Sequence, residues 1–182
     1  MAELRFELNG QPQWVQANDN DVLLDVLRHT CQLKATRFGC GLSQCGACHV
    51  MVDDHAVPAC STPMWAVAGK RVVTVEGLGT PEQPHALQTA FANVQAAQCG
   101  YCSSGMLMTA AALLHTTPQP TPEQVRAALQ GNLCRCGAHN RIVRAVCQAA
   151  DAMGAKSLSK LNGLFGISDS LTVCVLDIIS KV

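Results

Sequence analysis

The sequence predicts a small α+β unit followed by an all-α unit of four short helices. Short apolar segments separated by turn residues fill the first part of the chain, whereas apolar residues recur at helical spacing after residue 80. The stretch Gly77 to Pro81, rich in glycine and proline, has the composition of a linker between these patterns. We therefore expect domains at 1–78 and 79–154, with a C-terminal extension at 155–182.

The first unit is expected to begin with a β-hairpin. Apolar and polar residues alternate over 4–8, which is the period of a half-buried strand, and the Asn-Gly pair at 9–10 favours a tight turn. Asn20 or Asp21 is placed to cap a helix over 22–27. The rest of the unit is expected to comprise a glycine-rich loop over 38–48, strands over 50–52, 57–60 and 71–75, and a turn at 53–54.

The second unit is expected to contain four helices. Apolar spacing predicts the first two over 87–94 and 104–115. A Thr-Pro-Glu-Gln sequence at 121–124 combines a cap, a proline in the first turn and a glutamine that can reach back, so the third should run from there to residue 129. The fourth is expected over 141–153, ending at Gly154. Beyond it, helical spacing recurs over 158–165, while 171–179 suits either a strand or a helix. Three roles are open for this tail: docking on a partner, which we favour, an unrelated or disordered extension, or a targeting peptide for a larger assembly.

Composition narrows the function classes. The chain has 182 residues, no net formal charge, 48% hydrophobic residues and eleven cysteines, which argues against a disordered chain. Neutrality argues against nucleic acid or an anionic membrane as the main partner, because both favour a surplus of Lys and Arg. No apolar stretch is long enough to span a bilayer, and no basic and apolar leader is visible. An odd number of cysteines excludes complete internal pairing, so we expect a reducing compartment.

Three cysteines in the glycine-rich loop have the spacing of a plant-type two-iron, two-sulfide (2Fe–2S) site, Cys40-x4-Cys45-x2-Cys48. Cys60, after the following hairpin, would be the fourth ligand. Glycines in the loop would let backbone N–H groups approach the inorganic sulfides and stabilise their negative charge. These glycines are Gly39, Gly41 and Gly46. Zinc or buried thiols are the alternatives, although zinc sites usually pair two short cysteine motifs.

A second set of four cysteines falls in the helical unit. Cys99-x2-Cys102 lies at a predicted helix junction, and Cys134-x-Cys136 precedes the last helix. Four thiolates from two helix junctions suit either zinc or a second 2Fe–2S cluster. The first set favours the cluster, because two redox centres form an electron relay. The remaining cysteines are expected to pack as small hydrophobic residues, and they are Cys31, Cys147 and Cys174.

These motifs resemble the small iron–sulfur subunit of the molybdenum hydroxylases, the xanthine oxidase family. The resemblance covers about residues 4–152 and rests on the segments 38–48, 75–78, 98–102 and 131–137. It implies a β-grasp ferredoxin-like domain followed by a four-helix bundle, each holding one 2Fe–2S cluster. It also implies a large partner subunit, with molybdenum on a molybdopterin in its cytosine dinucleotide form, where substrate is hydroxylated with oxygen from water.

The resemblance also implies roles for single residues. Gln98 is expected to touch the pterin and Cys136 to lie against it, so that electrons enter the helical domain there and leave through the ferredoxin-like domain. The flanks at 95–102 and 138–139 are most similar to the nicotinate dehydrogenase and isoquinoline 1-oxidoreductase small subunits. That similarity implies an N-heteroaromatic substrate and, as electron acceptor, a c-type cytochrome or an FAD subunit. At 138–140, however, Ala-His-Asn replaces the Thr and aromatic residue common in relatives.

Several alternatives stay open at this point. The chain would also suit an aldehyde, xanthine or CO dehydrogenase of the same family, a freestanding ferredoxin, or a zinc-stabilised interaction module. We expect it in the cytoplasm, held at the membrane by a partner, or exported with one. His49 is expected to have a structural role or make a polar contact rather than bind metal. His139 is expected to be a polar surface residue or to face the partner or the pterin. Met106 and Met108 are expected in the core.

Overall fold

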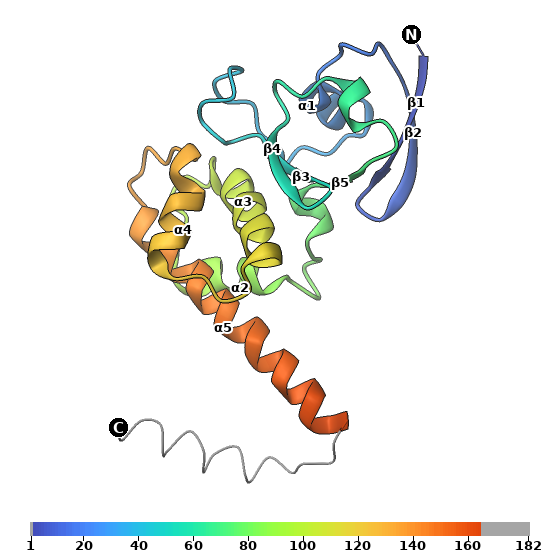
Figure 1. Ribbon diagram of the computed structural model, residues 1–182. Coiled ribbons are helices and arrows are strands. Elements are labelled where there is room, and N and C mark those ends of the chain that lie inside the picture. The colour runs from blue at the N-terminus through green and yellow to red at the C-terminus, as the bar shows by residue number, and fades with distance from the viewer. Residues whose placement is uncertain (1, 165–182) are drawn as a thin grey trace, which may run out of the picture.

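A computed structural model describes the backbone of residues 2–164 and the side chains of residues 3–154. A mixed β-sheet forms the first part of the molecule, and a group of helices packs beside it (Figure 1). This arrangement agrees with the predicted order of a sheet-containing part followed by helices. The last helix begins among the other helices, and its C-terminal part projects away from them.

The sheet has five strands in the order β2-β1-β5-β3-β4. β1 and β5 run parallel, and the other neighbouring strands are antiparallel. The β1–β2 turn uses Asn9 and Gly10, both with positive φ, as the sequence predicts for this pair. The strands are β1 (Ala2–Leu8), β2 (Gln11–Ala17), β3 (His49–Val52), β4 (His55–Pro58) and β5 (Arg71–Val73). β5 is therefore shorter than predicted, because the chain turns into the 3-10 segment η3 (Val75–Gly77).

Strand β3, which lies between β5 and β4, is buried on both faces. Val50 and Val52 belong to a core with Phe6 and the short helix that follows β2. Met51, which points the other way, belongs to the core of the helical part. Because successive side chains of a strand alternate between faces, β3 joins the two cores directly. The two parts of the molecule therefore meet across a packed strand rather than through a linker alone.

The helix after β2 does not use the predicted cap. It begins as α1 (Leu23–Asp25) and continues as the wider π-helical segment η1 (Val26–Thr30), and neither Asn20 nor Asp21 caps it. The Asp21 carboxylate instead accepts the N–H of Asn18 at 2.8 Å. The N–H of Leu23 donates to the carbonyl of Thr62 at 2.8 Å, in the segment that leads to the 3-10 turn η2 (Met64–Val67). The cap prediction was wrong because a neighbouring segment satisfies the helix N-terminus.

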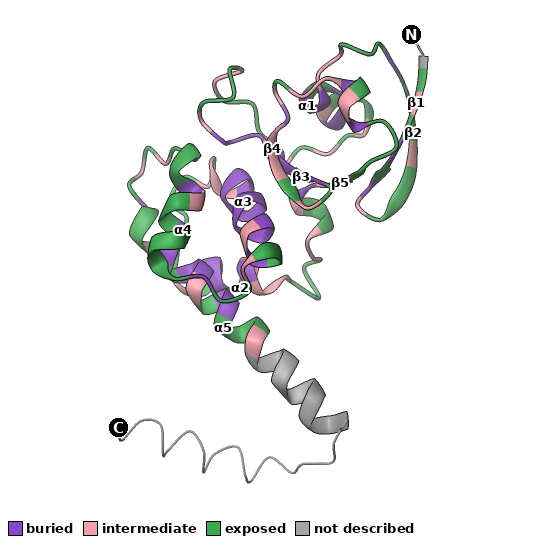
Figure 2. Ribbon diagram, in the orientation of Figure 1, coloured by how far each residue is buried: buried purple, intermediate pink, exposed green. Residues whose placement is uncertain are grey.

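Helices α2 to α5 surround a second core. Their bounds are α2 (Ala86–Asn93), α3 (Ser103–Thr116), α4 (Pro122–Ala128), the 3-10 turn η4 (Leu129–Gly131) and α5 (His139–Leu164). α3 is buried along most of its length, between β3 and the other helices (Figure 2). Met106 and Met108 of α3 lie in this second core, as predicted. The predicted capping box is confirmed, since Thr121 and Gln124 exchange hydrogen bonds of 2.8 and 3.3 Å.

Helix α5 does not end at Gly154, contrary to the prediction, and continues to Leu164. The side chain of Gln119 gives another reason for a glycine at position 154. Its side-chain amide donates to the carbonyl of Ala150 at 2.8 Å, and a Cβ at position 154 would lie 2.7 Å from that amide nitrogen. Glycine here gives room for a contact rather than ending the helix. Residues 165–182, including Cys174 and the apolar stretch 171–179, lie outside the described residues.

Across residues 2–164, none of the helices combines the length and the apolar content that crossing a membrane would need.

Candidate functional site: two sets of cysteines

In the loop between η1 and β3, cysteine sulfurs accept backbone hydrogen bonds. Cys40 Sγ accepts the N–H groups of Leu42 at 3.3 Å and Gln44 at 3.2 Å. Cys45 Sγ accepts the N–H of Cys40 at 3.3 Å. The loop thus wraps its own amides around its sulfurs, which is the arrangement that stabilises thiolate ligands of an iron–sulfur cluster.

The glycines of this loop leave room for those contacts. A Cβ at Gly39 would lie 2.6 Å from Cys45 Sγ. Gly41 and Gly46 both have φ of +68°, in the left-handed region that favours glycine. A Cβ at Gly46 would also lie 2.7 Å from the carbonyl oxygen of Gly131, in the helical part. Each of the three predicted glycines therefore has a structural reason to lack a side chain.

Two thiols of the first set, Cys40 and Cys48, differ strongly in pKa. Backbone N–H groups of Leu42 and Gln44 lower the pKa of Cys40 to about 7. Burial raises the pKa of Cys48 to about 12, and the neighbouring thiols of Cys60 and Cys45 affect it as well. Cys40 thus lies near Cys45, and Cys48 lies near Cys60 and Cys45. Because metal binding requires thiolates, it would release a proton from the buried Cys48.

The second set joins two segments that are far apart in the sequence. Cys99 and Cys102 lie between α2 and α3, whereas Cys134 and Cys136 lie between η4 and α5. The N–H of Tyr101, followed by a hydrogen bond with Cys136, lowers the pKa of Cys99. Burial raises the pKa of Cys102 to about 12, and the adjacent Cys134 thiol adds to this. The structure therefore pairs Cys99 with Cys136 and Cys102 with Cys134.

The thiols meet in pairs rather than around one point. Among the described residues, no group of three or more His, Cys, Asp and Glu side chains is arranged to hold a metal ion. The donor chemistry, however, fits iron–sulfur clusters: each set offers four cysteines, the amides of the first loop point at sulfur, and glycines give the space.

The two sets are neighbours in the fold. They share a cavity of about 180 Å³, and its lining residues are Gly39, Cys40, Cys45, Ala47, Cys99, Tyr101, Cys102, Leu133 and Arg135. The N–H of Leu133 donates to the carbonyl of Cys45 at 3.0 Å. Tyr101 donates its hydroxyl to the carbonyl of Phe38, and Arg37 lies over the Tyr101 ring at 5.2 Å. The sequence predicted both sets, but it did not predict that they face a common cavity.

A polar group between the sets was missed by the sequence reasoning. His49 Nδ1 and Thr109 Oγ1 lie 2.7 Å apart, and Asn132 Nδ2 donates to the carbonyl of Gly46 at 3.2 Å. His49 thus makes a polar contact, as expected, and burial lowers its pKa. Asn132 lies inside the segment 131–137 that carries the family resemblance, so that motif was a usable signal. No sequence signal pointed to Thr109, which lies in the apolar helix α3.

The other predicted residues take different positions. Gln98 is exposed and lines an open cavity of about 480 Å³ together with Gln95 and Arg141. His139 begins α5 and lines a cavity of about 190 Å³ that also borders Asn132. Cys31 and Cys147 are half-buried against the first and second cores, and burial raises the pKa of both. They pack as the sequence predicts for isolated cysteines.

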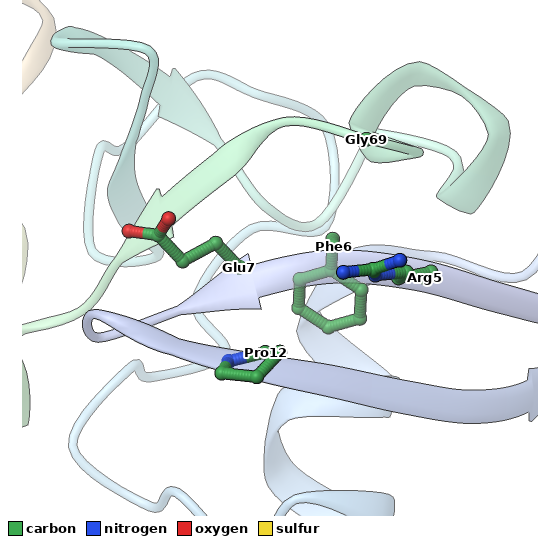
Figure 3. A pocket seen from close by; sticks show the side chains of 5 residues that line it. All are labelled: Arg5, Phe6, Glu7, Pro12 and Gly69. Carbon is green, nitrogen blue, oxygen red and sulfur yellow. The ribbon is translucent and has the colours of Figure 1, made fainter.

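A further cavity of about 490 Å³ lies away from the cysteines, on the sheet. Its lining residues are Arg5, Phe6, Glu7, Pro12 and Gly69, from β1, β2 and the turn before β5 (Figure 3). None of the predicted site residues contributes to it, so it is separate from the candidate redox site.

Comparison with known proteins finds two matching families. Residues 6–72 match the family described as 2Fe-2S iron-sulfur cluster binding domain, and residues 74–147 match the [2Fe-2S] binding domain family. One nicotinate dehydrogenase subunit of Pseudomonas putida is 48% identical over 81% of this chain and 94% of its own length. The alpha subunit of isoquinoline 1-oxidoreductase from Brevundimonas diminuta is 47% identical over 81% of this chain and 97% of its own length.

Solved structures give the same result. Quinoline 2-oxidoreductase from Pseudomonas putida 86 matches with a TM-score of 0.79 at 35% identity, covering 83% of this chain and 94% of that one. Aldehyde oxidoreductase from Desulfovibrio gigas matches with a TM-score of 0.84 at 40% identity, covering 86% of this chain but 18% of that longer one. The chain therefore belongs to the molybdenum hydroxylase family, as an electron-transfer iron–sulfur subunit with two 2Fe–2S binding domains, whose large partner subunit carries the molybdopterin.

Proposed function

We propose that this subunit serves a hydroxylase of N-heteroaromatic compounds such as nicotinate or isoquinoline. The relatives named for nicotinate and isoquinoline are 48% and 47% identical to this chain. Relatives named for xanthine in Bacillus subtilis and for aldehydes in Escherichia coli are 38% and 36% identical. The support for the N-heteroaromatic class is therefore these two relatives, which the chain matches over nearly their whole length. Identity alone does not rank the classes, since a nicotinate dehydrogenase subunit of Eubacterium barkeri is 36% identical and the Desulfovibrio gigas aldehyde oxidoreductase 40%. The substrate would react on the large subunit, not on this chain.

We propose that each set of four cysteines holds one cluster. The first set is Cys40, Cys45, Cys48 and Cys60, and the second is Cys99, Cys102, Cys134 and Cys136. A bound 2Fe–2S cluster takes up and releases one electron. The observation that carries this assignment is the cradle of the first loop, where backbone N–H groups point at the sulfurs of Cys40 and Cys45 and a side chain at Gly39 would strike Cys45.

We propose that the sheet-containing part is a β-grasp ferredoxin-like domain at 1–78 and that the helical part is a four-helix bundle domain at 79–154. The mixed sheet with α1 on one face supports the first assignment, and the shared core of α2 to α5 supports the second. Residues 155–182 are then an extension, into which α5 continues as far as Leu164.

We propose that electrons enter at Gln98 and Cys136 from a molybdopterin cytosine dinucleotide held by the partner. Exposure of Gln98 supports this, because a residue that touches a partner's cofactor must be accessible in the isolated subunit. The acceptor would be a c-type cytochrome or an FAD subunit. The protein would work in the cytoplasm, at the membrane through a partner, or after export with one, and fractionation of cells followed by immunodetection tests the location.

The function is tested by purifying the chain from its native source with its bound partners. We expect about four irons and four acid-labile sulfides per chain, since each set would hold two of each. A large molybdenum-containing subunit should co-purify, and the complex should hydroxylate an N-heteroaromatic compound. Zinc without visible absorption would support an interaction module instead. Both clusters without any large subunit would support a freestanding ferredoxin.

The position of electron uptake is tested with Cys136→Ala. Turnover with the natural acceptor should be lost, while the spectrum of the ferredoxin-like cluster is retained, because the first set does not include this cysteine. Unchanged turnover would contradict the assignment of Cys136.

A further inference from the structure

We propose that Asn132 is a positioning residue that holds the two cysteine sets at a fixed separation by binding the backbone of the first loop. This inference rests on the proposed function, because it assumes that both sets hold clusters. Asn132 is 2% exposed and lies two residues before Cys134. It is therefore a buried amide at the junction of the two parts of the molecule.

Asn132 and Leu133, just before Cys134, donate hydrogen bonds to two neighbouring carbonyls of the loop that carries the first cysteine set. The N–H of Leu133 donates to the carbonyl of Cys45 at 3.0 Å. The side chain of Asn132 donates to the carbonyl of Gly46 at 3.2 Å. Because Cys45 and Cys134 are proposed ligands of different clusters, this pair of hydrogen bonds joins the sets through a very short stretch of chain. The Asn132 bond is the part of it that a side-chain substitution can remove.

Helix α3 packs against the same carbonyl, that of Gly46. A Cβ at Gly105 would lie 1.9 Å from the oxygen of Gly46, so the helix backbone packs directly on it. Gly46 itself has positive φ, and a Cβ there would lie 2.5 Å from Asn132 Nδ2. The peptide after Gly46 is thus enclosed between α3 and Asn132. The Gly46 carbonyl also accepts the N–H of His49 at 3.2 Å, a bond within its own part of the chain. Loss of the Asn132 bond would leave that bond in place and remove the connection to the segment that carries Cys134.

Stability alone does not explain a buried asparagine here. Its Oδ1 has no hydrogen-bond partner among the described residues, and burying an unpaired acceptor is unfavourable. His49 Nδ1 lies 3.5 Å from the other amide atom, Asn132 Nδ2, and 2.7 Å from Thr109 Oγ1. It therefore does not supply a hydrogen bond to Asn132 Oδ1. An apolar residue would fill the space without this cost. What the amide adds is a donor aimed at Gly46.

The test compares Asn132→Asp and Asn132→Ser with Asn93→Asp in the complete purified complex. Aspartate keeps the size but replaces the donor by an acceptor that repels the Gly46 oxygen, and serine is too short to reach it. Asn93 is exposed on α2 and controls for the added charge. The readout is the spin–spin splitting between the two reduced clusters in low-temperature electron paramagnetic resonance, because magnetic coupling falls steeply with distance. Iron and sulfide contents are measured on the same samples.

We expect both Asn132 variants to retain both clusters and lose splitting, with the larger loss in Asn132→Asp, while Asn93→Asp matches the wild type. Unchanged splitting with both clusters present would overturn the positioning role. Loss of a cluster from both Asn132 variants would also overturn it, because Asn132 would then be needed for assembly rather than for separation. A wild-type complex without two clusters would instead refute the proposed function.

Discussion

The two cysteine sets are built in different ways. The first draws Cys40, Cys45 and Cys48 from one loop whose own amides reach its sulfurs, and only Cys60 comes from beyond β3 and β4. The second joins the α2–α3 connection to the segment before α5, so about thirty residues of α3 and α4 separate its halves. One site is mostly a local loop conformation, whereas the other exists only when helices have packed. Their responses to substitution should therefore differ.

The largest expected difference comes from removing one ligand of each set. Cys45→Ser and Cys134→Ser should each lose about half of the iron, since each two-iron cluster has its own four thiolates. Cys134→Ser should also lower the free energy of unfolding more, because it removes a tie between distant segments. Iron analysis and urea unfolding measure the two effects. Cys147→Ala, outside both sets, should retain all iron, and loss of both clusters from either serine variant would show that the sets are not independent.

Gly105→Ala should weaken both sets together. Its Cβ would lie 1.9 Å from the Gly46 oxygen, so either α3 or the first loop must move. Overpacking of this kind costs about 1–3 kcal/mol of unfolding free energy. Gly131→Ala is the matched control, because nothing lies within 4 Å of a Cβ there. Urea unfolding followed by circular dichroism makes the comparison, and equal stabilities of the two variants would mean that the contact is not tight.

Thr121→Ala should affect the second region alone. Thr121 caps α4, which leads into the segment that carries Cys134, and loss of such a cap costs about 1 kcal/mol. Thr89→Ala on the exposed face of α2 lacks a capping role and should be nearly neutral. Hydrogen exchange should show faster opening of α4 with unchanged protection in β3. Equal loss of protection in both places would mean that the two regions open as one unit.

The smallest effect is expected from a surface ion pair near the contact between the sheet and α3. Arg71 and Asp54 form an ion pair at 2.5 Å, and His115 of α3 approaches the same carboxylate at 3.8 Å. Asp54→Asn should cost no more than about 1 kcal/mol, because the pair is at the surface, and the effect should shrink in high salt. Asparagine tolerates the positive φ of 70° at this position. Thermal unfolding at low and high salt measures it, and a large, salt-independent loss would contradict a surface role.

Local signals predicted much of the molecule. The Asn-Gly turn, the Thr121 capping box and the apolar spacing of α3 all appear where expected, because each depends on neighbours within a few residues. The predicted cap at Asn20 or Asp21 and the predicted end of the last helix at Gly154 were wrong. A distant group explains the first, since Thr62 satisfies the start of that helix. In the second, Gln119 accounts for the glycine at 154, while the helix continues past it to Leu164. Local propensity could not report either contact.

The same distinction holds for the site. The sequence by itself predicts which thiols form the two sets, because ligand spacing and glycine content are constraints of a short loop and of helix junctions. Only the tertiary structure decided that the sets share a cavity and that Asn132 and Gly105 enclose the Gly46 carbonyl. Those contacts join residues about sixty to ninety positions apart. They arise from burial and packing of β3 against α3, which no pattern within a few residues can encode.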